Sequence, residues 1–238
     1  MLLLEQIQKN TMRLALILCM VLLGNTMTKG QVNNPLYDLQ RVHFGFSIIG
    51  NNAKLKYTNS ADFMDFDTMQ QVRTVSFPGF GVGGIVNIRL LDHWDYRTMV
   101  NIQFVERHLN FHFKGGNFEE AIIRSTYMEI PMQLKYKSKR YKNIRMYLVG
   151  GSTFRYDFAS DKETDRSNTK PIVALNPPTF SYDVGVGLDL YYEYFKFSPE
   201  FRISNGLGNS MIKDEFIYSG AITRMSPKLI QFILHFEG

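Results

Sequence analysis

The sequence is poor in cysteine, in tryptophan and in long apolar runs. One cysteine among 238 residues excludes a small domain held together by disulfides. No apolar run approaches the roughly 18 residues that a membrane-spanning helix needs, so a helical membrane protein is excluded as well. A hydrophobic fraction of 45% excludes a disordered chain. Aromatic residues are abundant, however: 19 Phe and 13 Tyr are a heavy load for a soluble enzyme.

Residues 1–30 have the layout of a secretory signal peptide. Lys9 and Arg13 precede an apolar run at 14–23, and Thr28 and Gly30 are small residues in front of a cleavage site. The run is too short to anchor the chain in a bilayer as a helix. Met12 is an alternative start, because residues 12–31 already make a complete signal. We therefore expect a signal peptide at 1–30 and one mature domain at 31–238.

The only cysteine, Cys19, lies inside this predicted signal and follows Leu18, which makes it a poor site for lipid attachment. The mature chain then contains no cysteine, and an exported protein without disulfides is typical of the bacterial envelope. Cleavage also reduces the net charge from +5 to +3, since three basic residues and one acidic residue are removed. We expect no nucleic-acid partner from such a small charge, and no small-molecule substrate is evident.

After residue 40 the sequence alternates between apolar and polar residues with a period of two, which predicts β-strands. The clearest segment is 180–192, where one face carries aromatic rings at both ends and aliphatic side chains between them. Strands that cross a membrane show this pattern, because rings favour the two interfaces. Seven other segments alternate in the same way: 42–48, 80–90, 96–104, 128–136, 144–148, 195–203 and 230–236.

The connections between these eight segments alternate in length. Those at 50–76, 110–121, 157–179 and 204–227 are long and polar, and those at 91–93, 137–142 and 193–194 are short. Outer-membrane barrels have long outer loops and short periplasmic turns. The sequence therefore predicts an all-β fold, an eight-stranded antiparallel transmembrane barrel in the outer membrane with both termini in the periplasm. A soluble barrel of the lipocalin kind is the alternative, since alternation alone does not tell inside from outside.

The charged faces of the strands should point into the lumen, which in an eight-stranded barrel is just wide enough for side chains to fill. We expect a paired polar network there, and a conducting pore is the less favoured alternative. The network comprises Arg89, Arg97, Arg107, Glu129, Arg145, Asp183, Asp189, Glu200 and Arg202. On the lipid side we expect an interfacial aromatic girdle of Trp94, Tyr96, Tyr136, Phe180, Tyr182 and Tyr192.

Sequence motifs for cofactors and metals are weak. Gly79, Gly81 and Gly84 match G-x-G-x-x-G, but they begin a strand, and a nucleotide site needs them between a strand and a helix. We expect these glycines to make room for opposing Arg or Tyr side chains. His108 and His112 lack the helical periodicity of a metal site. Asp62, Asp65 and Asp67 form an acidic loop without the glycine turn of a calcium loop. No cofactor or metal is expected.

A small barrel enzyme that acts on outer-leaflet lipid is the catalytic alternative. His43 and Ser47 share one strand face and Asp183 could supply a carboxylate, but residues four apart in a strand stand about 13 Å apart. His108, His112 and Ser125 near the opposite rim are a second set. Neither set defines a catalytic site, so we expect no enzyme activity.

Several segments resemble the PorT family of outer-membrane proteins. They are residues 43–47 (His-Phe-Gly-Phe-Ser), 78–84 (Pro-Gly-Phe-Gly-Val-Gly-Gly), 129–135 (Glu-Ile-Pro-Met-Gln-Leu-Lys) and 183–189 (Asp-Val-Gly-Val-Gly-Leu-Asp). The similarity extends along essentially the whole mature chain, although the last two motifs recur in many small barrels.

The resemblance implies an integral outer-membrane protein required for type IX secretion, with other subunits of that machinery and membrane lipid as partners. That pathway exports virulence proteases and, in gliding bacteria, adhesins. The family offers no catalytic motif, so no site residue is transferred. A generic structural or adhesive barrel is the third reading of the sequence, beside the secretion component and the lipid enzyme.

Overall fold

The computed structural model describes residues 33–59, 69–113, 118–158, 178–209 and 222–238. The predicted signal peptide and the acidic residues Asp62, Asp65 and Asp67 lie outside the described residues. Within the ranges that are described, no helix combines the length and the apolar character that crossing a membrane requires.

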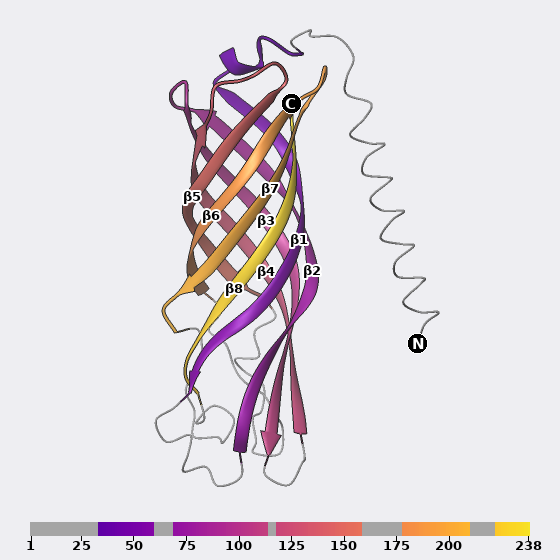
Figure 1. Ribbon diagram of the computed structural model, residues 1–238, viewed down its shortest axis with the longest axis vertical. Coiled ribbons are helices and arrows are strands. Elements are labelled where there is room, and N and C mark those ends of the chain that lie inside the picture. The colour runs from indigo at the N-terminus through magenta and orange to yellow at the C-terminus, as the bar shows by residue number, and fades with distance from the viewer. Residues whose placement is uncertain (1–32, 60–68, 114–117, 159–177, 210–221) are drawn as a thin grey trace, which may run out of the picture. The chain divides into compact units, whose positions relative to one another are not determined.

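Eight strands form a closed antiparallel barrel, as predicted (Figure 1). Each strand pairs with its neighbours in the sequence, and β1 pairs with β8 from Gly45↔Glu237 to Asn59↔Ile222. From Val42↔Ile88 to Ala53↔Phe77, β1 also pairs with β2, so the part of the wall that faces lipid has no open strand edge, which is the condition for a sheet in lipid. The strands are β1 (Val42–Asn59), β2 (Met69–Arg89), β3 (Trp94–Phe113), β4 (Phe118–Lys137), β5 (Ile144–Asp157), β6 (Pro178–Tyr191), β7 (Lys196–Leu207) and β8 (Ile222–Glu237).

The two faces of each strand differ as the alternation predicts. In β6, Val184 and Val186 are more than half exposed on the outside of the barrel, whereas Ser181 and Asp183 are buried inside it. A soluble barrel has the opposite arrangement, with its apolar face inward. The outward apolar face and the buried polar face therefore identify a barrel built for a lipid environment.

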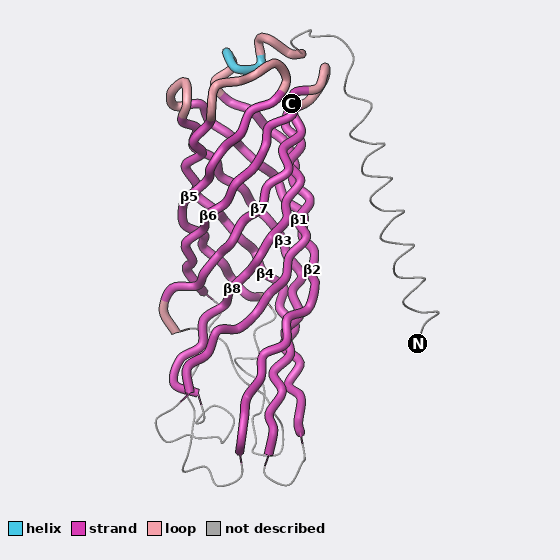
Figure 2. Tube along the Cα trace, viewed as in Figure 1, coloured by secondary structure: helices cyan, strands magenta, loops and turns pink. Residues whose placement is uncertain are grey.

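The two ends of the barrel have different connections (Figure 2). The short links 90–93, 138–143 and 192–195 lie at the end that also holds the C-terminus and a 3-10 helix, η1 (Tyr37–Leu39). We call this the terminal end. At the opposite end the strands lead into 60–68, 114–117, 159–177 and 210–221, and we call it the loop end.

The boundaries predicted for three connections are wrong, because strands occupy much of 50–76 and 110–121 and both ends of 204–227. β1 continues to Asn59 and β2 begins at Met69. Likewise, β3 continues to Phe113 and β4 begins at Phe118. Strands of 18–21 residues are about twice as long as the 9–11 that a bilayer needs. The barrel wall therefore continues beyond the lipid at the loop end.

The alternation reverses where the strands leave the lipid, which explains the wrong prediction. In β1, Lys54 and Lys56 face outward and Ala53 and Leu55 are buried inside, so the polar side chains change faces. The core changes accordingly: at the loop end it is apolar and is formed by Ala53, Val105, Tyr127 and Leu229. A search for lipid-facing alternation does not detect strands of this inverted kind.

Glycine makes room for a large lumen side chain at one position that matters for the site. A Cβ on Gly187 of β6 would lie 2.3 Å from Cζ of Tyr147 on β5, which real Cβ contacts do not allow. Gly187 and Tyr147 are direct partners in the β5–β6 ladder. The absent side chain thus lets the Tyr147 ring lie across the strand and point into the lumen.

Candidate functional site

The candidate site is the polar interior of the barrel, and its centre is the carboxylate of Glu200. Arg97 on β3 forms an ion pair with Glu200 on β7, and both side chains are fully buried. The Tyr147 hydroxyl donates a hydrogen bond of 2.9 Å to the same carboxylate. The ring of His235 on β8 lies 3.4 Å from it. Four strands are joined through one side chain.

A second carboxylate, Glu129 on β4, lies one layer further toward the loop end. Arg155 on β5 forms an ion pair with Glu129, and Gln103 on β3 donates a hydrogen bond to it. Gln231 on β8 reaches the same carboxylate at 3.5 Å. The guanidinium of Arg155 also donates to the Ser204 hydroxyl at 2.5 Å, so that this layer connects to β7.

Asp183 on β6 is held mainly by hydroxyl and amide groups. Ser204 donates a hydrogen bond of 2.5 Å to its carboxylate and Gln133 one of 3.3 Å, and Thr153 donates a third. Such hydrogen bonds satisfy the carboxylate oxygens without a cation directly beside them. Asp183 therefore serves as a junction between β4, β5 and β7.

Three further ion pairs lie toward the terminal end. Lys135 contacts Asp189 at 2.7 Å, Lys137 contacts Asp95 at 2.5 Å, and Lys196 contacts Glu237 at 2.9 Å. All six side chains are buried. Removing a charge from water costs several kcal/mol, which is offset only when each charge has a well-placed partner.

Two predicted lumen residues have other environments. Arg107 donates a hydrogen bond of 2.5 Å to Ser125, and its guanidinium lies 5.4 Å from the centre of the Tyr127 ring. Arg202 is fully buried, and its Nε lies 3.8 Å from Glu200, at the limit of an ion pair. Both residues are in the lumen, but neither has a close carboxylate partner among the described residues.

The segment before β1 closes the terminal end of the lumen. Tyr37 of η1 is buried and its ring stacks on His43 with 3.8 Å between the ring centres. The Tyr37 hydroxyl lies 3.4 Å from Glu237, and the ammonium of Lys196 lies 4.8 Å from the Tyr37 ring centre. The cavity under this ring has a volume of about 10 Å³, which is room for about one water molecule. We call residues 33–39 the cap.

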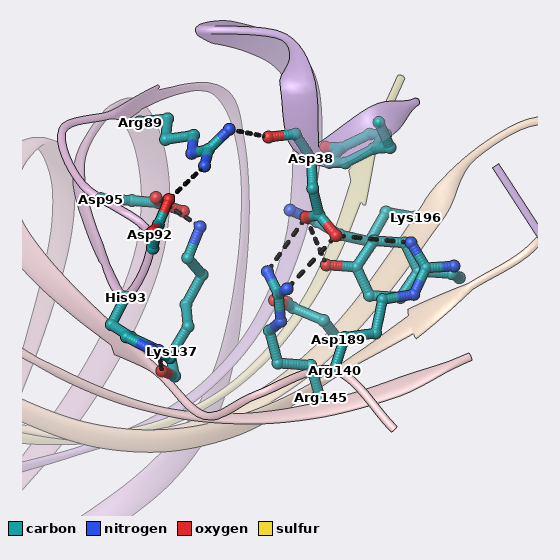
Figure 3. Close-up of polar contacts among 12 residues, drawn as sticks. Asp38, Arg89, Asp92, His93, Asp95, Lys137, Arg140, Arg145, Asp189 and Lys196 are labelled. Carbon is teal, nitrogen blue, oxygen red and sulfur yellow. Dashed lines mark hydrogen bonds and ion pairs between the residues drawn. The ribbon is translucent and has the colours of Figure 1, made fainter. Parts of the chain in front are cut away.

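Asp38 fixes the cap to the barrel (Figure 3). Its carboxylate accepts two hydrogen bonds from Arg145, at 3.0 and 3.2 Å, and one of 3.1 Å from the Tyr191 hydroxyl. Arg140 reaches it at 3.5 Å, and Arg89 donates to its backbone carbonyl. Burial of the carboxyl opposes ionisation, but Arg145 and Tyr191 hold the pKa of Asp38 below its ordinary value.

The structure therefore separates the nine predicted lumen residues into two groups. Arg89 and Arg145 lie at the terminal end, where they bind the cap; Arg89 is only half-buried and also pairs with the exposed Asp92 at 2.6 Å. The other seven line the lumen itself: Arg97, Arg107, Glu129, Asp183, Asp189, Glu200 and Arg202.

The six predicted girdle residues all lie on the outer face, at two levels. Trp94, Tyr136 and Tyr192 are at the terminal end next to the short links, and the Trp94 and Tyr136 rings are 4.9 Å apart. Phe180 and Tyr182 begin β6 at the loop end, where Phe180 packs on Phe154 at 5.2 Å. Tyr96 is half-buried and lies two residues from Trp94 along β3, toward the loop end.

Ser47, His235 and Glu200 form a chain of contacts like that of a serine hydrolase. The Ser47 hydroxyl lies 2.7 Å from Nδ1 of His235, whose Nε2 lies 3.4 Å from Glu200. The alternative set of His43, Ser47 and Asp183 that the sequence raised is not assembled: His43 stacks on Tyr37, and Asp183 accepts a hydrogen bond from Ser204.

This chain of contacts lacks access for a substrate. Ser47 is 1% exposed and His235 is fully buried. Glu200 is already bound by Arg97 and Tyr147. A nucleophile must reach a substrate carbonyl, so the geometry favours a structural role for this trio.

The other motifs have structural explanations. Gly79, Gly81 and Gly84 lie within β2, which continues to Arg89 and leads through a short link into β3. A Cβ on Gly79 would meet the side chain of Asn51, and a Cβ on Gly81 would meet that of Gln103. The expectation that these glycines make room for Arg or Tyr side chains is therefore wrong. His108 stacks on Phe77 and contacts Glu106 at 2.8 Å. The His112 side chain is not among the described ones, and the described residues contain no cluster of His, Cys, Asp or Glu suited to a metal.

Several network residues were missed by the sequence reasoning. Three of them, Asp95, Lys137 and Glu237, each lie one residue beyond a strand segment as we delimited it. Extending each segment by one residue would have found them. Tyr37 and Asp38 precede the first strand, where no alternation of polar and apolar residues could assign their side chains to the lumen. Their role depends on contacts with residues more than 100 positions away.

The comparison with protein families agrees with this architecture. The family model described as outer membrane protein beta-barrel domain matches residues 31–211. Among solved structures, the chain is similar to outer membrane protein OprG from Pseudomonas aeruginosa, with 13% identity, 82% of this chain and 92% of that chain covered, and a TM-score of 0.44. Neisserial surface protein A (NspA) gives 11% identity, coverages of 80% and 95%, and a TM-score of 0.40. The attachment invasion locus protein Ail of Yersinia pestis gives 9% identity, coverages of 84% of this chain and 100% of that chain, and a TM-score of 0.39. A search of curated proteins gave no match.

Proposed function

Because the chain belongs to the family of outer membrane protein beta-barrel domains, we propose that it is an integral outer-membrane accessory protein which acts through its two ends and its outer surface. The observation that carries the proposal is the filled lumen. Layers of ion pairs around Glu200, Glu129 and Asp189 join the strands across the interior, and the cap covers the terminal end. A barrel filled in this way is a rigid anchor and leaves transport and chemistry to its partners.

The specific process that we propose is type IX protein secretion. The support is the resemblance of segments 43–47, 78–84, 129–135 and 183–189 to the PorT family, which runs along the mature chain. On this proposal the protein is an assembly or accessory factor that contacts other subunits of the secretion machinery. It has no catalytic activity, cofactor or small-molecule substrate of its own.

The proposed orientation has both termini and the short links in the periplasm and the loop end outside the cell. Outer-membrane barrels generally have short periplasmic turns and longer outer loops, which supports this arrangement. The cap would then be periplasmic, and the extended strands β1 to β4 would project from the cell surface. A periplasmic partner would then contact the cap and the short links, whereas a partner outside the cell would contact the extended strands.

A structural or adhesive barrel is the second candidate, favoured by the strands that continue beyond the lipid-facing belt. β2, β3 and β4 have 20 or 21 residues each and present a sheet at the loop end. Lipid enzymology is weaker, since the trio Ser47, His235 and Glu200 is buried. The substitution Ser47→Ala tests that alternative: the lipid A mass spectrum of cells carrying this variant should equal that of the parent.

Deletion and complementation test the proposed function. We expect the deletion strain to retain type IX cargo inside the cell, and the wild-type gene to restore export. Variants of the short link 138–143 that still insert should fail to restore it. Crosslinking in native outer membranes should recover secretion subunits with the wild-type protein. Normal export in the deletion strain, or a barrel that crosslinks to no secretion subunit, would count against the proposal.

A further inference from the structure

Strands β1 and β2 separate at the loop end of the barrel (Figure 1). Their pairing ends at Ala53↔Phe77, whereas β1 remains paired with β8 as far as Asn59↔Ile222. β2 likewise remains paired with β3 as far as Met69↔Phe113. The wall therefore has a gap on one side, between a two-stranded ribbon (β1, β8) and the sheet that contains β2.

A cleft of about 710 Å³ opens on the outer surface at this gap. It is mainly basic, with the exposed apolar side chain of Val75 beside the cations. It is lined by Lys54, Lys56, Lys228, Leu55, Val75 and Asn205, together with Thr74. The three lysines are exposed and come from β1 and β8. Cations and apolar groups are thus combined in one depression.

The three lysines repel one another in the structure as it stands. Lys54 and Lys228 are direct partners in the β1–β8 ladder, and Lys56 lies two residues further along the same face of β1. Like charges directly opposite each other destabilise a sheet. Among the described residues, none of the three ammonium groups is in an ion pair. The carboxylate of Glu106 on β3 is bound to Arg124 and His108. An anion in the cleft would relieve this repulsion.

The cleft lies directly beyond the lipid-facing belt. On β8, Phe232 and Ile230 are exposed apolar residues, and Lys228 is the next outward residue along the strand. Two residues advance a strand by about 7 Å, which places the ammonium group in the layer of lipid headgroups. Val75 at the cleft is 40% exposed and continues the apolar surface toward the cations.

We propose that this cleft binds the phosphorylated headgroup of an outer-leaflet glycolipid, with Lys54, Lys56 and Lys228 holding the phosphate groups. A dissolved polyanion would use the cations alone, whereas the apolar side chains and the depth in the headgroup layer fit an anion that is attached to acyl chains. The proposal rests on the orientation given under the proposed function, in which the loop end faces the outer leaflet.

Native mass spectrometry of the purified mature chain in detergent tests the cleft. The probes are lipid A with two phosphates, the same lipid A after dephosphorylation, phosphatidylglycerol and inositol hexakisphosphate. The variant Lys54→Gln/Lys56→Gln/Lys228→Gln should bind diphosphorylated lipid A about a hundredfold more weakly than the wild type, on the basis of about 1 kcal/mol for each lysine. The matched control Arg41→Gln/Lys139→Gln/Lys142→Gln removes three exposed cations elsewhere and should bind like the wild type.

Three outcomes would overturn the proposal: equal binding by the wild type and the cleft variant, equal losses in the cleft variant and the control, or binding of dephosphorylated lipid A as tight as that of the diphosphorylated form. Tighter binding of phosphatidylglycerol or inositol hexakisphosphate than of lipid A would overturn the glycolipid source. Urea unfolding of both triple variants checks that they fold.

The orientation is measured separately in intact cells. A Lys54→Cys variant should react with a membrane-impermeant maleimide, because the only cysteine of the sequence, Cys19, lies in the predicted signal peptide. Labelling only after lysis would overturn the proposed orientation in the membrane. It would also overturn the proposal that the bound glycolipid comes from the outer leaflet. The binding measured in detergent does not depend on the orientation and would still decide whether the cleft holds phosphate. Failure of the proposed orientation and failure of the proposed binding site are therefore distinguishable.

Discussion

Arg97 and Glu200 are 103 residues apart in the sequence and form an ion pair in which both side chains are fully buried. The pair joins β3 to β7 across the lumen. Each charge has lost its water, so each depends on the other, and the consequences of breaking the pair can be measured.

The substitution Arg97→Met should destabilise the barrel by about 3–5 kcal/mol, because it leaves the Glu200 carboxylate buried without its cation. Urea unfolding in lipid vesicles measures this loss. Asp92→Asn is the control, since Asp92 is exposed and should change stability by less than about 0.5 kcal/mol. The double variant Arg97→Met/Glu200→Leu should lose less than the sum of the single variants. Additive losses would show that the two side chains do not depend on each other.

The substitution Gly187→Ala should destabilise the barrel by about 1–3 kcal/mol, because the new methyl group overlaps the Tyr147 ring. Displacement of that ring also weakens its hydrogen bond to Glu200. Gly84→Ala is the matched control, since a Cβ there meets nothing within 4 Å. If both variants unfold at the same urea concentration, the close packing of Tyr147 on Gly187 is not important for stability.

The barrel should be electrically silent in planar lipid bilayers. The lumen is crossed by several layers of buried ion pairs, so that deleting the cap, residues 33–39, should also leave it silent. Single-channel recording of the wild type and of the deletion variant measures this. Discrete conductance steps in the wild type would overturn the filled lumen. Steps confined to the deletion variant would make the cap the main barrier.

Acid should loosen the cap. The pKa of Asp38 in the folded protein lies below its ordinary value of 3.8, so its ionised form stabilises the cap above that pH. This stabilisation is lost as the pH falls through the lowered pKa. A spin label on Leu39→Cys should have restricted motion at neutral pH and become more mobile only below about pH 4. The variant Asp38→Asn should be mobile at every pH, and a label on Leu91→Cys should not respond. A Leu39 label whose mobility is independent of pH would contradict this role of Asp38.

Much of the fold could be predicted because alternation is a local signal. In 180–192, every second side chain faces lipid, and the structure has a strand at Pro178–Tyr191. The signal failed at 50–76. There the polar Lys54 faces outward and the apolar Ala53 faces inward, which is the reverse of the arrangement in the lipid-facing part of the strands. The period there is still two, but its phase is inverted, because water and not lipid surrounds the outer face.

The site could be predicted as a set of residues but not as a set of pairs. The alternation assigns Ser47 to an inward face, yet only the closed barrel brings Ser47 on β1 beside His235 on β8. The cap escaped prediction altogether, since Asp38 lies outside any strand and meets Arg145 and Tyr191 only after folding.

The lipid-facing parts of the strands and the polarity of their two faces follow from the amino-acid sequence alone, because each depends on side chains two residues apart. Three features become visible only in the folded barrel: which charges pair across the lumen, the closing of one end by Tyr37 and Asp38, and the separation of β1 and β2 at the other end. These relationships depend on register and closure, which bring together residues such as Arg97 and Glu200 from opposite halves of the chain.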